Sequence, residues 1–397
     1  MPAFEEARTM ILDRVSAGGV DTIPLDEAAG RILFEDVIAS RDLPGFDNSA
    51  MDGFAVQAGD CTGDARLVIC GYHPAGVVDG ARVDRGCAVR IMTGGAIPEG
   101  ADAVVPFEET EESPGAIRVA GAVARGAHVR SRGEDVKAGE VVIPRGTRLR
   151  PPEIGMLASF GRMMVPVHRK VRVAILATGD ELVEPGEPVP DGRIVNGNGL
   201  ALAAAARLAG AEPVLLGIAR DTRESLREKL SAGFSCDALV TSGGVSAGDR
   251  DLVREALAEL GVTAVFWKVD VRPGGPTAFG MKDGKPVFSL PGNPVSSLLT
   301  FEEFVRPALR RMMGHARVVR PCVPVILAEP FRKKAGKVHL LRVKLARAGA
   351  SLTASSAGPQ ETAISRTLLS ADGIAVLPAD RTVFAAGETI FVHDLYP

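Results

Sequence analysis

The sequence predicts a multidomain α/β protein, with a doubly wound α/β domain, a β-rich module before it and a small β-barrel after it. From about residue 168, apolar strand-like runs alternate with helical runs. Between about residues 45 and 145, short β-type runs are separated by Gly, Pro and Asp. After Gly314 the pattern is again all β. Alternating strands and helices indicate a parallel sheet with helices on both faces.

Length and composition agree with a chain of several cores. The 397 residues leave room for about two to four domains of roughly 100–200 residues each. Because aromatic residues are only 5% of the chain, Val, Leu, Ile and Ala must fill those cores. The net charge of −3 gives no broad attraction to nucleic acid or to a membrane surface, so any anion binding must be local.

The N-terminus and the most apolar helix argue against secretion and membrane insertion. Residues 1–6 are acidic and lack a long apolar run, so they do not resemble a signal peptide. The run at residues 200–208 carries Arg207 and is far shorter than the roughly 20 residues that span a bilayer. We therefore expect a cytoplasmic protein without nucleic-acid or membrane partners.

The cysteines and histidines do not form a metal-binding pattern. The five cysteines include no C-x-x-C pair and are odd in number, so we expect buried free thiols in a reducing compartment. The six histidines are scattered without the spacing of a zinc site. The cysteines are Cys61, Cys70, Cys87, Cys236 and Cys322.

The first half of the chain contains one helix and then short strands. Phe4, Ala7, Ile11, Leu12 and Val15 repeat with helical spacing, which predicts a helix over residues 4–15. Pro144 and the pair Pro151-Pro152 mark the end of the β-rich module. The strands expected in that module are residues 66–70, 88–92, 103–105, 116–119 and 141–143.

The second half predicts the α/β domain and the barrel. Residues 278–280 and 286–290 resemble a hairpin, and residues 355–363 resemble a long polar loop on the barrel. In the α/β domain we expect strands at 171–177, 213–218, 237–241 and 264–268, and helices at 198–208, 223–230, 251–260 and 294–313. In the barrel we expect strands at 323–328, 338–345, 374–377 and 389–392.

The most informative stretch is residues 237–251, D-A-L-V-T-S-G-G-V-S-A-G-D-R-D, which predicts a strand, a tight loop and a helix. The backbone N–H groups of residues 242–246 can converge on an anion, and the helix N-terminus adds partial positive charge. Asp249 and Asp251 would repel that anion unless a divalent cation lay between them. The stretch therefore predicts a phosphate together with Mg²⁺, at the sheet edge where such folds bind ligands.

Five further segments are dense in polar residues, and each alone is a common turn. The turn at Asn293 is equally explained as a helix N-cap, and Asp52, Thr93 and Asp135 as turn caps. Together with the glycine loop, the ordered motifs resemble those of the molybdopterin molybdenumtransferases, bacterial relatives of the gephyrin E domain, over nearly the whole chain. They are N-S-A-M-D-G-F (48–54), M-T-G-G-A-I-P (92–98), R-G-E-D (132–135), T-G-D-E-L (178–182), S-G-G-V-S-A-G-D-R-D (242–251) and L-P-G-N-P-V-S (290–296).

The resemblance implies an elongated homodimer of four-domain chains. The implied domains are a discontinuous one (1–44 and 146–167), an inserted β-rich one (45–145), a molybdopterin-binding α/β domain (168–315) and a C-terminal barrel (316–397). The cleft would lie between the inserted domain of one protomer and the last two domains of the other. The implied reaction inserts molybdate into adenylylated molybdopterin and releases AMP with Mg²⁺. Implied partners are the enzyme that adenylylates molybdopterin and the downstream molybdoenzymes.

The resemblance also assigns roles to individual residues. Glu181 and Asp251 would hold Mg²⁺, with Asp221 and Asp249 nearby, and Asp52, Thr93 and Asp135 would complete the cleft from the inserted domain. Arg342 would meet molybdate, unless it is only a solvated strand residue. The full set of substrate-binding residues implied is Ser242, Gly243, Gly244, Ser246, Lys268, Arg272, Pro273, Pro291, Gly292, Asn293, Arg342 and Thr362.

Three segments depart from the family pattern. The family's K-P-G-K-P is R-P-G-G-P at residues 272–276, so Gly275 removes one of the two lysine charges. The family's D-S-N is N-G-N at 196–198, and its Q-x-S-S is Q-E-T-A at 360–363, where Glu361 adds a negative charge. These changes favour an alternative: a diverged paralogue that binds molybdopterin as a scaffold, or that uses another oxyanion such as tungstate. An unrelated dehydrogenase is disfavoured, because no G-x-G-x-x-G follows a strand with an acidic residue about 20 positions on.

Overall fold

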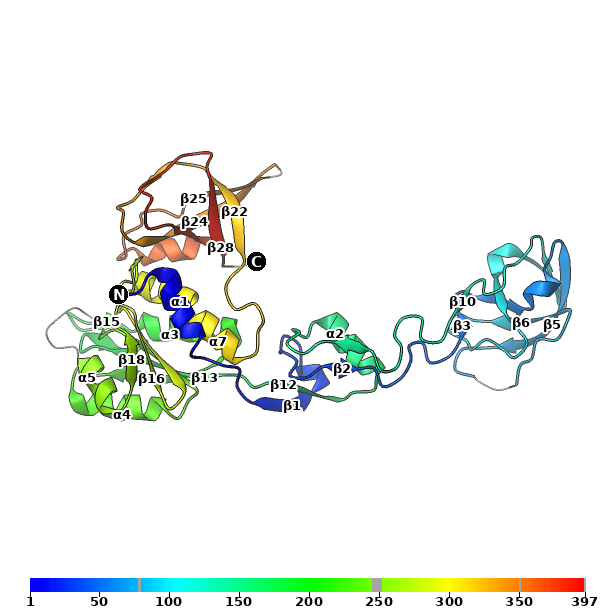
Figure 1. The fold of residues 1–397 in the computed structure, drawn as a ribbon, viewed down its shortest axis with the longest axis horizontal. Coiled ribbons are helices and arrows are strands. Elements are labelled where there is room, and N and C mark those ends of the chain that lie inside the picture. The colour runs from blue at the N-terminus through cyan, green and yellow to red at the C-terminus, as the bar shows by residue number, and fades with distance from the viewer. Residues whose placement is uncertain (78–79, 245–251, 350, 396–397) are drawn as a thin grey trace.

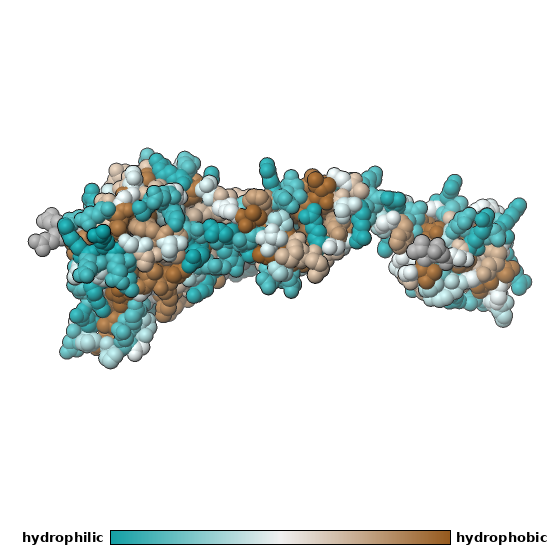
Figure 2. Space-filling view, turned by 90° about the horizontal axis from the view of Figure 1, so that it is seen from below, coloured by the Kyte–Doolittle hydropathy of each residue, from teal (hydrophilic) through white to brown (hydrophobic). Residues whose placement is uncertain are grey.

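The computed structural model describes residues 1–77, 80–244, 252–349 and 351–395. The chain is elongated, with an α/β unit and a barrel at one end, a small central unit, and a β-sheet at the other end (Figure 1). A narrow connection joins that far sheet to the central unit in the space-filling view (Figure 2). The β-sheet at the far end is therefore separated from the α/β unit and the barrel by the whole central unit (Figure 1).

The α/β unit is built on a six-stranded sheet in the order β16-β13-β17-β21-β20-β18. The first four strands run parallel, and β20 and β18 continue the sheet in antiparallel fashion. The predicted parallel sheet and the predicted hairpin, now β20 and β21, are thus confirmed. The strands are β13 (Arg172–Thr178), β16 (Glu212–Ala219), β17 (Ala238–Ser242), β18 (Thr263–Phe266), β20 (Ala278–Lys282) and β21 (Lys285–Leu290).

Helices cover both faces of this sheet. Helices α4 (Arg223–Gly233) and α5 (Leu252–Glu259) pack on one face, and α3 (Gly197–Ala209) and the helical segment from residue 294 pack on the other. That segment was predicted as one helix, and it consists of α6 (Pro294–Thr300), a π-helix η4 (Phe301–Val305) and α7 (Arg306–Met312). No helix in the described ranges is long and apolar enough to cross a membrane.

The N-terminal helix α1 (Phe4–Leu12) packs on the α/β unit, beside α7 (Figure 1). Phe4, Ala7 and Ile11 are buried in the same core as the sheet. The predicted helix extended to Val15, but the helix ends at Leu12 with Asp13 as its C-cap. The domain division expected from the sequence grouped residues 1–44 with 146–167, whereas this helix shares its core with the α/β unit.

The central unit consists of two small antiparallel ladders around α2. Strand β1 (Val20–Pro24) pairs with β12 (Met164–His168), and β2 (Val37–Ile38) pairs with β11 (Val141–Ile143). Helix α2 (Pro151–Ser159) and the turn η1 (Leu25–Glu27) complete its core. The sequence assigned residues 141–143 to the β-rich module, but Ile143 packs in the core of the central unit.

The far end is a six-stranded sheet in the order β7-β4-β6-β5-β9-β8, called the inserted sheet below. Apolar residues are buried on both of its faces. The short pair β3 (Asn48–Ser49) and β10 (Val129–Arg130) connects it to the central unit, and the turns η2 (Ala58–Asp60) and η3 (Phe107–Glu109) contribute Ala58 and Phe107 to its core. Its strands are β4 (Gly53–Val56), β5 (Ala65–His73), β6 (Cys87–Ile91), β7 (Ala103–Pro106), β8 (Thr110–Ser113) and β9 (Ala116–Val119).

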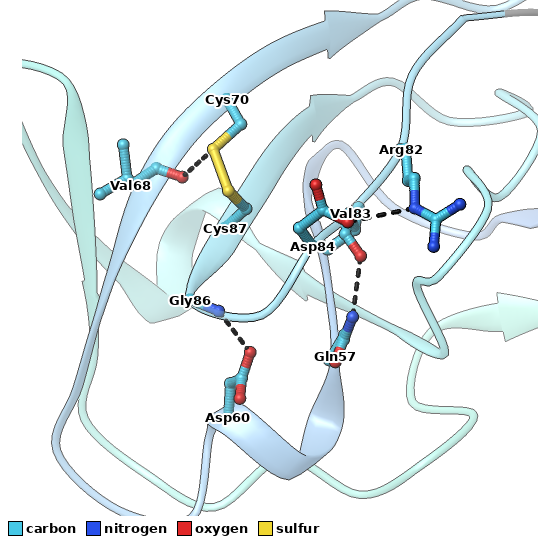
Figure 3. The surroundings of a disulfide bond; sticks show 9 residues. All are labelled: Gln57, Asp60, Val68, Cys70, Arg82, Val83, Asp84, Gly86 and Cys87. Carbon is cyan, nitrogen blue, oxygen red and sulfur yellow. Dashed lines mark hydrogen bonds and ion pairs between the residues drawn. A yellow bond between two sulfur atoms is a disulfide. The ribbon is translucent and has the colours of Figure 1, made fainter.

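The expectation that all cysteines are free thiols was wrong. Cys70 of β5 and Cys87 of β6 form a disulfide, with their Cα atoms 5.8 Å apart (Figure 3). The two strands are parallel neighbours, and an irregularity in their register at Cys70 brings the two side chains together. Cys61 and Cys236 are buried free thiols as expected, whereas Cys322 is an exposed one.

The C-terminal region is a closed five-stranded barrel in the order β24-β25-β22-β28-β26, which returns to β24. Strand β19 (Val271–Arg272) of the preceding segment pairs with the start of β24 and so ties the barrel to the α/β unit. The predicted barrel is therefore confirmed. Its elements are β22 (Cys322–Leu327), β24 (Val338–Ala348), β25 (Ser351–Ser356), β26 (Gly373–Leu377), β28 (Thr389–Asp394), the helical turn η5 (Ser365–Ser370) and the small ladder of β23 (Phe331–Arg332) with β27 (Val383–Phe384).

Candidate functional site

A cavity of about 480 Å³ lies at the carboxyl ends of β13 and β17. One side is formed by the α/β unit, including the short parallel pair β14 (Leu182–Val183) and β15 (Ile194–Val195). The other side is formed by η5 of the barrel, which contributes Arg366 and Leu368. The cavity thus occupies the sheet edge at which the sequence predicted ligand binding.

The glycine loop after β17 needs its glycines for steric reasons. Gly243 and Gly244 have φ of 98° and 68°, values that L side chains rarely adopt. A Cβ at Gly243 would lie 2.5 Å from the carbonyl oxygen of Thr178, and one at Gly244 would clash with Val253. The N–H of Gly243 donates to Leu290 O at 3.1 Å, so it is not free for an anion in this conformation. Ser246, Asp249 and Asp251 lie outside the described residues.

Asn198 joins the two loops that form the floor of the cavity. Its Nδ2 donates to Ser242 Oγ at 2.9 Å and to Gly292 O at 2.7 Å. The neighbouring Asn196 accepts from Gly199 N at 3.0 Å and caps α3. The departure N-G-N therefore keeps a capping group and a bridging group, although it lacks the family's carboxylate.

Thr178 is a polar cavity residue whose role the sequence did not suggest. Its side chain is 3% exposed, and its Oγ1 has no hydrogen-bond partner among the described residues. That oxygen lies against the glycine turn, within 3.0 Å of the position a Cβ would take at Gly243. A buried hydroxyl without a partner is costly, so a polar ligand group in the cavity would stabilise it.

The loop at residues 290–293 has a structural role in this conformation. Asn293 Oδ1 accepts from Val295 N at 3.1 Å and from Ser296 N at 3.4 Å, which is the N-cap arrangement considered from the sequence. Gly292 lines the cavity, and its carbonyl is held by Asn198. Pro291 is buried beneath it.

The acidic residues near the cavity are arranged in two groups. Glu181 lines the cavity, and its exposed carboxylate folds back over Gly179. Asp221 and Asp180 exchange hydrogen bonds, because the backbone N–H of each donates to the carboxylate of the other at 3.1 and 3.3 Å. The described ranges contain no cluster of three His, Cys, Asp or Glu side chains that could hold a metal. A metal site here would therefore need Asp249 or Asp251.

Arg342 is fully buried in the barrel, so its interpretation as a solvated strand residue was wrong. Its Nη2 donates to Pro359 O at 3.1 Å and to Glu361 O at 3.3 Å. Its Nε and Nη1 have no partner within the described ranges, and burial lowers the pKa of the guanidinium. Gln360 holds the backbone N–H and C=O of Arg342 with its side-chain amide, 3.1 Å in each case.

Other basic residues gather where β19 meets β24. Arg272 pairs in register with His339, which is half-buried. Burial, together with the positive charges of Arg272, Lys333 and Arg342, lowers the pKa of His339 to about 4, so the imidazole is neutral. A histidine surrounded by three cations indicates a region of positive potential. Pro273 is buried next to Arg272, and Thr362 is half-buried in the loop that carries Glu361.

Lys268 is not brought into the cavity at the ends of β13 and β17. It lines a separate open hollow with Met1, Glu6 and Trp267. The chain therefore places this predicted residue apart from Glu181 and Ser242, which share one cavity.

On the inserted sheet, Asp52 and Thr93 are in direct contact. The Asp52 carboxylate accepts from Thr93 N at 2.7 Å and from Thr93 Oγ1 at 2.8 Å, and these bonds lower its pKa. Asp135 lies on the connection to the central unit, where its N–H donates to Leu43 O at 3.0 Å. Within one chain the inserted sheet lies at the opposite end of the molecule from the α/β unit that carries the cavity (Figure 1).

Comparison with known proteins gives a consistent result over the full length. Three family models match: "MoeA N-terminal region (domain I and II)" at residues 3–161, "Probable molybdopterin binding domain" at 174–311 and "MoeA C-terminal region (domain IV)" at 324–395. The chain is 36% identical to molybdopterin molybdenumtransferase 2 of Mycobacterium tuberculosis, covering 100% of both chains. It is 34% identical to a Staphylococcus epidermidis molybdopterin molybdenumtransferase, covering 93% of this chain and 90% of the relative.

Solved structures agree with the sequence relatives. A crystal structure of a molybdopterin biosynthesis moeA protein from Pyrococcus horikoshii OT3 has a TM-score of 0.85 and 30% sequence identity, and it covers 99% of both chains. The whole arrangement of units, including the far sheet, is therefore shared with a solved relative.

Proposed function

Because the chain belongs to the molybdopterin molybdenumtransferase (MoeA) family, enzymes that insert molybdenum during molybdenum cofactor biosynthesis, we propose that it joins molybdate to adenylylated molybdopterin with release of AMP. The observation that carries this proposal is the buried Arg342, which has two unpartnered N–H donors among the described residues. Glu361 is a neighbouring negative charge, but no described residue accepts a hydrogen bond from Nε or Nη1 of the guanidinium, so a tetrahedral dianion such as molybdate would supply the missing acceptors.

The pterin substrate would occupy the cavity between β17 and η5. Thr178 and Ser242 offer hydroxyl groups there, and Gly244 and Ser246 would add donors from the glycine loop. The apolar part of the lining, which includes Ile194, Leu298 and Leu368, suits a planar heterocycle. Arg366 of the barrel would bring a positive charge to the mouth of the cavity, opposite the glycine loop.

Mg²⁺ would be held by Glu181 and Asp251, with Asp221 and Asp249 nearby, since carboxylate oxygens are the ligands that Mg²⁺ prefers. Among the described residues, the exposed Glu181 carboxylate on the cavity wall fits this role. When bound, the cation would neutralise the pyrophosphate and the departing AMP.

The inserted sheet would act in the cleft of a partner copy. The inserted sheet, which carries Asp52 and Thr93, lies at the other end of the chain from the α/β unit (Figure 1), and Asp135 lies on the connection between them, so these residues would meet a substrate in the cavity of another copy. A symmetric dimer would bring the far end of each chain to the cavity of the other. The homodimer, the partner enzymes, the cytoplasmic location and the four-domain division expected from the sequence stay predictions.

The test is to mix the purified full-length protein with adenylylated molybdopterin, Mg²⁺ and molybdate, and to measure AMP release together with formation of active cofactor. Molybdate-dependent AMP release is the expected result. Tight pterin binding without AMP release would instead support the scaffold alternative. AMP release with tungstate but not with molybdate would support the alternative in which the protein uses another oxyanion.

A further inference from the structure

Gly275, where the family motif has its second lysine, does not face an empty space. A Cβ built on Gly275 would lie 3.8 Å from Nζ of Lys337, the residue before β24. The nearest backbone atom to that Cβ would be Val271 O at 3.4 Å, an ordinary contact, and φ of Gly275 is not in the left-handed region. The ammonium of Lys337 therefore lies where a side chain at position 275 would begin.

Strand pairing across the two units brings these residues together. Strands β19 and β24 are parallel, with Val271 opposite Val338 and Arg272 opposite His339. Val338 N also donates to Asp270 O at 3.3 Å, just before that pairing begins. The segment that follows β19 and the residue that precedes β24 are thus neighbours because the barrel is attached to the α/β unit at this ladder.

The charge of Lys337 is available to a ligand. Its side chain is exposed, and its ammonium forms no ion pair or hydrogen bond within the parts of the chain that the structure describes. Its carbonyl accepts from Nζ of Lys333 at 3.1 Å, which fixes the backbone from which the side chain extends. The nearby His339 is neutral, so the cations of this junction are Arg272, Lys333 and Lys337, with Arg342 farther along β24.

We propose that Lys337 is an oxyanion-binding residue, which supplies from the barrel the second positive charge that Gly275 leaves out of the motif at residues 272–276. The ligand class is a tetrahedral dianion, molybdate or tungstate, and the inference rests on the proposed function for its biological substrate. A compact ammonium and the Arg272 guanidinium would then approach the dianion from two different units, which makes the site depend on the β19–β24 ladder.

The proposal predicts a specific pattern in a charge-swap series. Lys337→Met should raise the molybdate concentration for half-maximal AMP release about tenfold, and Lys337→Arg should retain most of the affinity. Gly275→Lys alone should not tighten molybdate use, because the new ammonium would lie against Lys337. In the Lys337→Met background, Gly275→Lys should restore molybdate use to within about threefold of the wild type, a strong departure from additivity.

Lys334→Met is the matched control, because Lys334 is an exposed lysine three residues away on the same segment. It should leave the molybdate dependence unchanged, and all variants should melt at the wild-type temperature. If Lys334→Met and Lys337→Met changed the molybdate dependence equally, the effect would come from the general electrostatic field of the segment, and this result would overturn the proposal. So would a Lys337→Met variant with unchanged molybdate dependence, or a double variant without rescue.

Calorimetric titration with sodium molybdate separates this inference from the proposed function. If the wild type releases no AMP, the proposed function fails, but the titration still tests whether Lys337 binds molybdate. Weaker molybdate binding by Lys337→Met than by the wild type and by Lys334→Met supports the site. Equal binding by all three proteins, or no binding by the wild type, overturns it.

Discussion

Asn198 Nδ2 lies 2.9 Å from Ser242 Oγ, and the same nitrogen lies 2.7 Å from Gly292 O. One amide group of α3 thereby holds the hydroxyl at the start of the glycine loop and the carbonyl of the 290–293 loop. The two loops follow β17 and β21, which are neighbouring parallel strands, and so meet at one edge of the sheet. Asn198 therefore links the two loops that form the cavity floor.

Replacing Asn198 by Ala should weaken pterin binding more than it weakens the fold. The change removes two hydrogen bonds and frees both loops, so we expect about a tenfold loss of affinity for molybdopterin, equivalent to roughly 1.4 kcal/mol. Fluorescence titration with molybdopterin would measure it. Ser159→Ala is a suitable control, because the Ser159 hydroxyl donates to Gly155 O within α2 of the central unit, and its loss should leave pterin binding unchanged.

Arg342→Met should separate substrate binding from stability. The variant removes a buried charge that has two unpartnered donors among the described residues and replaces it with an apolar side chain of similar length, so the melting temperature should stay the same or rise. The molybdate concentration for half-maximal AMP release should rise at least about tenfold. Arg347→Met, at an exposed position farther along β24, should change neither quantity. A large drop in melting temperature with normal molybdate use would assign Arg342 a purely structural role.

Two inactive variants should complement each other if the cleft is shared between copies. Asp52→Asn alters the inserted sheet, and Glu181→Gln alters the cavity wall, and each alone should abolish AMP release. When an equal mixture of the two variants is unfolded and refolded, about half of the dimers would contain one chain of each variant. In each mixed dimer one of the two clefts is intact, so about a quarter of wild-type activity should return. The activity of the unmixed variants, refolded in parallel, is the baseline. A mixture no more active than that baseline would argue that each chain uses its own inserted sheet.

His339 should make the fold sensitive to mild acid. Its pKa is about 4 in the folded protein against an ordinary value of 6.5, because burial and three neighbouring cations disfavour its protonated form. Between these two values the unfolded chain binds the extra proton, so stability should fall as the pH is lowered from 6.5 toward 4. Denaturant unfolding of His339→Gln should show a shallower fall over that range. Part of the slope should remain, because burial also lowers the pKa of His315 and His168.

A histidine outside this environment provides the comparison. His128 is exposed on the inserted sheet at a φ of 55°, a conformation that Asn tolerates. His128→Asn, a substitution at an exposed site, is therefore measured in parallel as the comparison for His339→Gln. If the two variants reduced the fall of stability with pH equally, the acid sensitivity could not be attributed to His339.

Local patterns predicted the elements well where each element is a periodic, buried run. The parallel strands β13, β17 and β21 are almost continuous apolar segments, and the hairpin of β20 and β21 has a tight turn at Asp283 and Gly284. The glycine loop was also predictable, because positive φ and close approach leave only glycine at Gly243 and Gly244. These features depend on neighbours within a few residues.

Partners distant in the chain were not predictable in the same way. The Cys70–Cys87 disulfide depends on a register irregularity between two parallel strands, and the cysteine spacing gave no indication of it. The place of α1 on the α/β core depends on its contacts with η4 and α7, which lie far from it in the chain. Thr178 at the end of β13 and Arg366 of η5 line one cavity, although they are far apart in the chain, because the barrel packs against the α/β unit.

The sequence by itself determined the order of strands and helices, the glycine loop and, through six ordered motifs, the family. Those properties follow from hydrophobic periodicity and from the backbone freedom of glycine, which act locally. Only the tertiary structure decided that Arg342 is a buried cation, that Asn198 bridges two loops and that Lys337 lies against Gly275. The energy of a charge or a hydrogen bond depends on what surrounds it, and the surroundings are brought in by packing of segments far apart in the chain.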